Sequence, residues 1–282
     1  MKYAYLLPLA LLASGCVQTY RLGAGLHTHD LFYQARPITP QDSSVATATY
    51  VGGQLVSGNG YTGRGNGQHD SHTLGILQAS RAHSWRTGAV SYGAFGYLGE
   101  YRINKYTFSE YDANKQILPS AYEGTYGFYG WGLRGSAYFN TVLGRSVSWR
   151  FAGVEWAFSQ EYGDLYDVRQ RIPEQRIPRG SGSGYDEWFI ARSRSMATVA
   201  LASELEILNG PTRNKAFVFR YAVGKSLPDY TRAGWFNTVS FAAAYHYYRH
   251  AFHFHIGNTG RKSAFQIGYQ YRLGLKHKTP RS

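Results

Sequence analysis

The sequence contains a single cysteine, Cys16, so it cannot form a disulfide within the chain. Beyond the N-terminus it has no run of about 18 or more apolar residues, which argues against a membrane-spanning helix in the mature protein. It also shows no repeat of roughly 20 to 50 residues, so the sequence does not predict a solenoid or a propeller. If the chain enters a membrane, it does so with strands or through an attached lipid.

Tyrosine and glycine are abundant instead. The 282 residues include 25 Tyr and 33 Gly, aromatic residues make up 16% of the chain, and the mean hydropathy is −0.39. Both residue types favour β-structure with frequent turns, and aromatic side chains gather at membrane surfaces. The composition therefore predicts an all-β protein.

Basic residues exceed acidic ones, with 30 Lys and Arg against 17 Asp and Glu, a formal net charge of +13 and a pI near 9.7. Such an excess suits nucleic acid, anionic lipid or acidic polysaccharide. The Lys and Arg residues are scattered between strand ends and loops, which argues against a nucleic-acid partner. We expect anionic membrane lipids, including the phosphates of lipid A, as neighbours.

The last strand-like stretch, residues 263–275, alternates two kinds of side chain with a period of two, which is typical of a strand. A soluble sandwich would pack the apolar side into a core, whereas a membrane barrel turns it to lipid around a polar lumen. This stretch alone fits either. The apolar side consists of Phe265, Ile267, Tyr269, Tyr271, Leu273 and Leu275, and the other of Ala264, Gln266, Gly268, Gln270, Arg272 and Gly274.

Nine further segments are predicted strands, and their connections alternate between long and short. A sandwich has no reason to sort its loops in this way, whereas a membrane barrel has short periplasmic turns and long outer loops. Only the last link, residues 258–262, breaks the trend, and a change of phase near Ala152 and Gly153 predicts a bulge. The predicted strands are 44–57, 71–83, 88–101, 122–139, 146–161, 193–208, 214–225, 236–247 and 250–257.

By these alternating strands, by the Tyr, Trp and Phe at strand ends and by the sorted loops, residues 43–275 resemble bacterial outer-membrane β-barrel proteins. The resemblance implies the cell envelope of a Gram-negative bacterium, a single antiparallel transmembrane barrel of about 10 strands (8 to 10), and barrel-insertion machinery as a partner. An even strand number places both ends of the barrel in the periplasm. Such barrels often end on an aromatic residue, whereas this chain continues through a basic tail, residues 276–282.

The N-terminus reads as a signal peptide, residues 1–15, with a basic start, an apolar run and small residues before Cys16. It resembles the lipobox of bacterial lipoproteins, which implies diacylglycerol on the Cys16 sulfur, fatty acids such as palmitate, and lipoprotein-sorting machinery. Ala13 departs from that pattern, which most often has Leu, and an ordinary signal peptide that leaves a free thiol is the alternative. We expect residues 16–42 to be a lipidated periplasmic linker with one short element near residues 31–34.

Polar side chains on the lumen side of the predicted strands are the candidate functional residues. Arg–Glu pairs across a narrow barrel predict a structural charge network, and a selective pore for small solutes is the alternative. His253 and His255, about 7 Å apart on one face, could in principle bind a metal, but no carboxylate or cysteine lies in the same stretch, so we expect no metal site. The candidates are Arg134, Glu204, Glu206, Arg220, His246, His253, His255, Gln270 and Arg272.

The stretch that follows His255 resembles the end of outer-membrane lipid A deacylases, in which a histidine, a serine two residues later and a glutamate form a triad. Gly257 stands at the serine position and no acid follows, so a nucleophile is missing. We expect no catalytic residue, no cofactor and no enzymatic activity. The sequence favours a lipid-anchored outer-membrane barrel with a structural, binding or narrow-transport role. A soluble periplasmic barrel or sandwich lipoprotein and a lipid-modifying hydrolase are the alternatives.

Overall fold

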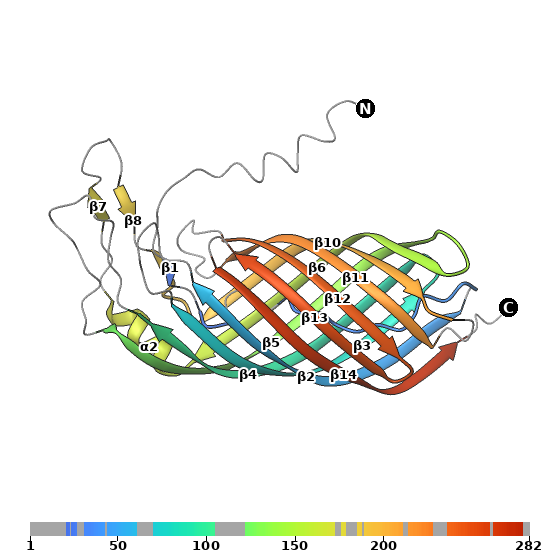
Figure 1. The fold of residues 1–282 in the computed structure, drawn as a ribbon, viewed down its shortest axis with the longest axis horizontal. Helices are drawn as coiled ribbons and strands as arrows, with labels where there is room; N and C mark the ends of the chain where they lie inside the picture. Colours follow the sequence, from blue (N-terminus) through green and yellow to red (C-terminus); the bar gives the residue numbers. More distant parts are fainter. Residues whose placement is uncertain are drawn as a thin grey trace, which may run out of the picture.

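The computed structural model describes residues 21–22, 24–26, 31–42, 44–60, 70–104, 122–172, 176–178, 185–187, 189–210, 214–227, 236–259 and 262–278. In these residues ten antiparallel strands close into a barrel in the order β10-β11-β12-β13-β14-β2-β3-β4-β5-β6 (Figure 1), which confirms the predicted fold. The strands are β2 (Val45–Gly60), β3 (Ser71–Trp85), β4 (Gly88–Ile103), β5 (Gly124–Val142), β6 (Val147–Tyr162), β10 (Ser195–Leu208), β11 (Lys215–Leu227), β12 (Phe236–Tyr247), β13 (His250–Thr259) and β14 (Lys262–Lys278).

The closing strand is longer than predicted. Lys276, His277 and Lys278 of the predicted basic tail continue β14 and pair with the first three residues of β2. A register shift between Arg272 and Gly274 interrupts this pairing once. The seam between the last and first strands thus extends to the end of the described chain.

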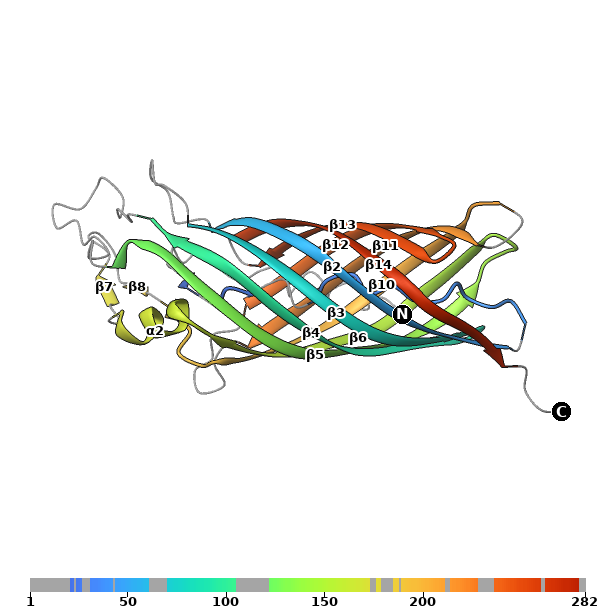
Figure 2. The ribbon, with the colours of Figure 1, turned by 90° about the horizontal axis from the view of Figure 1, so that it is seen from below.

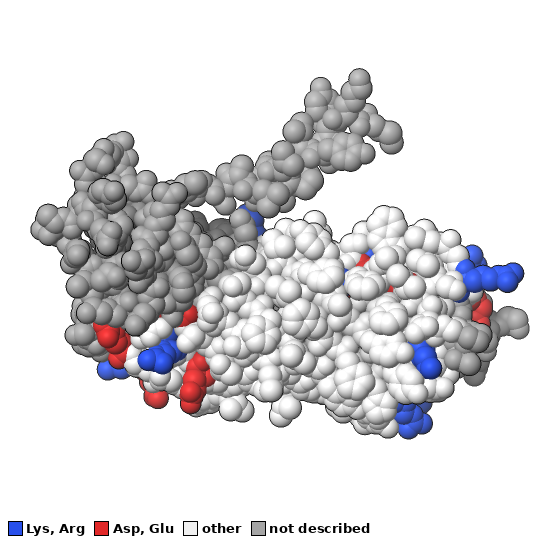
Figure 3. Space-filling model, in the orientation of Figure 1, with Lys and Arg blue, Asp and Glu red and all other residues white. Residues whose placement is uncertain are grey.

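The outer wall of the barrel is apolar. Along each strand exposed apolar side chains alternate with buried small or polar ones, and Leu55 and Leu201 are 71% and 69% exposed. Figure 3 shows that, on the face in view, charged side chains gather near the two ends and almost none lies between them. Such a band suits the hydrocarbon of a bilayer and would be a very large exposed apolar patch in water. The apolar side of β14 faces outward, so a soluble barrel with an apolar interior is not what the chain forms.

The predicted bulge lies in β6 at Phe151 and Ala152, both of which are exposed on the outer wall. Two consecutive outward residues shift the alternation, so Arg150 before the bulge and Glu155 after it both point into the lumen. The bulge also borders an apolar hollow of about 630 Å³ on the lipid side, lined mainly by outward side chains of β5, β6, β10 and β11.

The two ends of the barrel differ, as the loop lengths predict. At one end, here called the turn end, short links join β3 to β4, β5 to β6, β10 to β11 and β12 to β13. At the other, the loop end, lie the long connections, and β13–β14 is the short exception. The connection from β6 to β10 is more than the loop we predicted, because it contains α2 (Asp164–Arg171), β7 (Arg176–Pro178), β8 (Tyr185–Glu187) and β9 (Phe189–Ile190). No helix in the described part of the chain is long and apolar enough to span a membrane.

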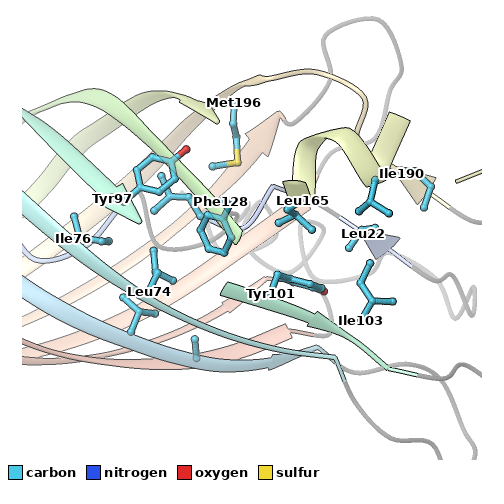
Figure 4. Packing of buried hydrophobic residues seen from close by; sticks show 14 of the residues in the cluster. Leu22, Leu74, Ile76, Tyr97, Tyr101, Ile103, Phe128, Leu165, Ile190 and Met196 are labelled. Atoms are coloured by element: carbon cyan, nitrogen blue, oxygen red, sulfur yellow. The ribbon is translucent and has the colours of Figure 1, made fainter. Parts of the chain in front are cut away.

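A small cap covers the loop end. β1 (Arg21–Leu22) pairs in parallel with β9, and Leu22 and Ile190 pack with Leu165 of α2 and Ile103 of β4 in one apolar cluster (Figure 4). Since β9 belongs to the long β6–β10 connection, residues 21–22 lie at the loop end. The first strand of the barrel, β2, nevertheless begins at the turn end.

The chain connects these two ends through the lumen. Residues 31–42, here called the inner segment, run inside the barrel toward the turn end, and Phe32, Ala35 and Thr39 are buried there (Figure 2). The expectation that this stretch is a spacer at the turn end is therefore wrong for the described residues. Its described residues reach from the middle of the lumen to the turn end, where their polar groups bond to the lumen wall.

Candidate functional site

The inner segment is bonded along its length to lumen-facing side chains. The Tyr33 hydroxyl shares a hydrogen bond of 2.6 Å with Nε2 of His246 on β12. Gln270 of β14 accepts from the Ala35 amide through Oε1 and donates through Nε2 to the Tyr33 carbonyl, both at 3.0 Å. Near the turn end, Gln41 donates to the Arg145 carbonyl at 2.8 Å. The backbone polar groups of an irregular stretch inside a barrel are thus paired by the wall.

Arg36 is the centre of the attachment. Its Nη1 donates to Oε2 of Glu204 at 2.6 Å, and its Nη2 donates to the Ser136 hydroxyl at 3.0 Å. Arg150 bonds the other oxygen of Glu204 and donates to Glu206 at 3.0 Å. The carboxylates of Glu204 and Glu206 on the wall are therefore paired with two guanidiniums, that of Arg36 on the segment and that of Arg150 on the wall. All four groups are buried.

Thr39 extends this attachment toward the turn end. Its amide donates to Glu206 at 3.0 Å, and its hydroxyl accepts from Arg150 at 3.2 Å. Charged groups this deeply buried are stable only when paired and hydrogen-bonded, so removing one partner would be costly.

Glu155 forms the second half of the network. Arg220 donates to both of its oxygens, through Nε at 2.8 Å and through Nη2, and Tyr138 donates its hydroxyl to Oε1. Arg36 and Arg134 each approach the same carboxylate to 3.7 Å, beyond hydrogen-bond distance. One carboxylate on β6 thus meets three guanidiniums, from β11, from β5 and from the inner segment.

The nine predicted candidates all lie on the lumen side, eight of them buried and Arg272 partly exposed. The network brings together Arg134, Glu204, Glu206 and Arg220, whereas His246 and Gln270 hold Tyr33 and its neighbours. His253 bonds Gln54 at 3.0 Å across Gly268, where a Cβ would come within 2.3 Å of the imidazole ring. His255 pairs across the sheet with Gln266, and Arg272 pairs with Tyr50.

The sequence interpretation missed three members of the network. Arg36 lies in a stretch without periodicity, and no pattern in the sequence marks it as a lumen residue. Arg150 and Glu155 lie on opposite parities of one predicted strand, so both face inward only because of the bulge. The predicted change of phase was the signal that could have found both.

The cap carries a fourth buried carboxylate, Glu161 at the end of β6. It accepts from the Gly25 amide at 2.5 Å and from Nη2 of Arg169 on α2 at 2.5 Å, and Arg169 also donates to the Ala191 carbonyl. This pair joins α2, the residues before the inner segment and the chain leading into β10. These contacts hold the described residues ahead of the inner segment against the loop end of the barrel.

Two sequence expectations concern metal binding and a hydrolytic triad at His255. The described residues contain no group of three or more His, Cys, Asp or Glu side chains placed to hold a metal ion. His255 is fully buried in the lumen, and Gly257 on the same side of its strand supplies no hydroxyl at the position of the deacylase serine.

Replacing Glu155 tests the importance of the network. We expect Glu155→Gln to lower the free energy of unfolding by about 3–5 kcal/mol, because three buried guanidiniums lose their shared counter-charge. Glu100→Gln, at an exposed position on β4, is the matched control and should change it by less than about 0.5 kcal/mol. The measurement is urea unfolding in detergent micelles, and equal small effects would contradict a stabilising role.

Neither a protein-family model nor a curated protein matches the sequence significantly. Among solved structures, the chain is similar to the beta domain of the Bordetella autotransporter Brka (12% identity, TM-score 0.35, 82% of this chain and 99% of that chain). It is also similar to the KdgM porin (8%, 0.29, 80% and 99%) and to the outer membrane protein OprG from Pseudomonas aeruginosa (8%, 0.31, 92% and 99%). These are bacterial outer-membrane barrels, and at such scores the likeness concerns architecture alone.

Proposed function

We propose that this protein is a lipid-anchored outer-membrane β-barrel whose lumen is filled by its own inner segment, so that it acts as a structural or binding component of the envelope. The observation that carries the proposal is the buried attachment of Arg36 to Glu204 and of Thr39 to Glu206, which fixes the segment across the lumen. Because the charges that hold the segment are buried and paired, its departure from the lumen would cost a large amount of free energy. The barrel is therefore closed at rest.

The outer wall supports the membrane assignment. Its band of exposed Leu, Phe, Tyr and Trp side chains suits acyl chains, and its basic residues suit anionic lipid, including lipid A phosphates. Such a barrel requires insertion machinery, and an acylated Cys16 requires lipoprotein-sorting machinery. Both are partners that we propose.

Narrow transport is a second candidate, favoured by the wall opposite the charge network. On β2 and β3, Nε2 of Gln54, both amide atoms of Gln78 and the Ser80 hydroxyl have no hydrogen-bond partner among the described residues. A row of buried donors and acceptors suits water molecules. A thin water path beside the inner segment would carry water or very small solutes only.

Cys16→Ser separates the anchor from the barrel. We expect the variant to lose palmitate labelling yet to remain in the membrane fraction and to keep the heat-dependent gel shift of a folded barrel, since its wall still contacts lipid. Thr19→Ser, a downstream change of similar size, should keep the label. Release of the Cys16→Ser protein into the soluble fraction would contradict a membrane-spanning barrel, and persistent labelling would contradict acylation at Cys16.

A further inference from the structure

Among the described residues, the charge network of the lumen contains four guanidiniums and three carboxylates. Glu204 is bonded by Arg36 and Arg150, and Glu206 by Arg150 and the Thr39 amide. Glu155 is bonded on both oxygens by Arg220 and on one by Tyr138. The hydrogen bonds of the three carboxylates are thus taken by groups other than Arg134.

Arg134 has no hydrogen-bonded carboxylate among the described residues. It lies over the ring of Phe32, 4.3 Å from its centroid, and its Nη1 donates to the Phe32 carbonyl. Its nearest carboxylate, Glu155, is 3.7 Å away, and its Nε and Nη2 donate to no atom among the described residues. The side chain is 1% exposed. A buried guanidinium that shares its counter-charge and has two nitrogens without hydrogen-bond acceptors is energetically unfavourable. An additional acceptor would remove that cost.

Two further donors without partners lie on the inner segment, to which Arg134 is bonded through the Phe32 carbonyl. Gln34 accepts from Ser91, and Ser91 bonds Ser136, which in turn accepts from Arg36. Along this chain of contacts the atoms without partners among the described residues are Nε2 of Gln34 and Nε of Arg36. On the opposite wall, by contrast, Gln78 leaves both a donor and an acceptor unpaired, which suits water. The unpaired nitrogens of Arg134, Gln34 and Arg36 are all donors, and such a set suits a group that accepts and does not donate.

We propose that Arg134 binds a small monovalent inorganic anion such as chloride between the barrel wall and the inner segment. A single negative charge balances the one guanidinium in excess among the described residues of the network. Nε and Nη2 of Arg134 provide the donors, with Gln34 and Arg36 on the segment side. Because Arg134 belongs to β5 and also bonds Phe32, the anion reinforces the attachment of the inner segment to the wall.

The test measures how thermal stability depends on the anion. Purified protein in detergent is melted at fixed pH and fixed ionic strength while sodium gluconate is replaced by sodium chloride. For the wild type we expect a melting midpoint that rises with chloride and then saturates, as binding to the folded state requires. Arg134→Met should abolish the dependence. Arg249→Met, which removes an exposed arginine at the turn end, should retain it.

Two outcomes would overturn the proposal. The first is a wild-type melting midpoint that does not change with chloride. The second is a chloride dependence of the Arg134→Met variant that equals that of the wild type. If that variant does not fold, the location is tested on the wild type by crystals grown in sodium bromide, where an anomalous peak within hydrogen-bond distance of Arg134 supports the site. Bromide peaks confined to the surface would contradict it.

Discussion

Removal of the inner segment is expected to turn a closed barrel into a conducting one. In a variant that lacks residues 17–42, Cys16 is joined to Ser43, two residues before β2, and nothing of the inner segment remains in the lumen. We expect ion current across a planar bilayer to rise roughly tenfold or more over the wild type, because a ten-stranded lumen is wider than its own wall side chains fill. Wild-type protein should stay near the baseline of a protein-free bilayer.

A point substitution tests the same prediction in the full-length chain, in case the shortened chain does not fold. Arg36→Glu places a carboxylate beside Glu204 and should weaken the attachment of the segment, giving intermittent current, whereas Arg36→Lys keeps the charge and should stay closed. The heat-dependent gel shift shows that each barrel is folded. A folded deletion variant that conducts no better than the wild type would mean that the wall closes the lumen without the segment. Steady current through the wild type would contradict a closed barrel.

The second large effect concerns the side of the membrane on which the N-terminus lies. Four residues lie between Cys16 and Arg21. The five extended steps from one to the other span at most about 18 Å, less than the roughly 25 Å of an apolar barrel band. Since Arg21 is at the loop end, Cys16 cannot reach the turn end. If the long connections are extracellular, a lipid on Cys16 enters the outer leaflet and not, as we expected from the strand count, the periplasmic one.

Epitope tags can measure this directly. A tag between Gln18 and Thr19 should be stained by antibody on intact cells, whereas a tag after Ser282 should be stained only after permeabilisation, because β14 ends at the turn end. The expected contrast is nearly all or none. The opposite pattern would mean that the barrel is inserted the other way round, and staining of neither tag on intact cells would contradict a surface-exposed N-terminus.

The barrel itself could be predicted because its information is local. Alternation with a period of two, turn residues and loop lengths placed each strand within about three residues of its observed ends, with a bulge where the phase changed. Helix α2 was missed although Asp164 and Asp167 in its first turn and Arg169 and Arg171 in its last turn match the helix dipole. A stretch of eight residues within a long loop gives too short a pattern to stand out.

The inner segment could not be predicted because its information is not local. Its partners are distant in sequence, since Glu204 lies 168 residues from Arg36 and Gln270 lies 235 residues from Ala35. The segment itself is irregular, so no period shows which side chains are buried. Parity correctly assigned the wall residues to the lumen side, but it could not show that one of their principal partners would be an arginine of the chain's own leading residues.

The route of the inner segment also constrains biogenesis. Residues 21–22 lie at the end of the barrel opposite to the one where β2 starts, so they have to be exported before or while β14 pairs with β2. Insertion of ten strands alone would not produce this molecule. The barrel must form around the inner segment of its own polypeptide. Residues 21–22 then reach the loop end through the lumen of the forming barrel.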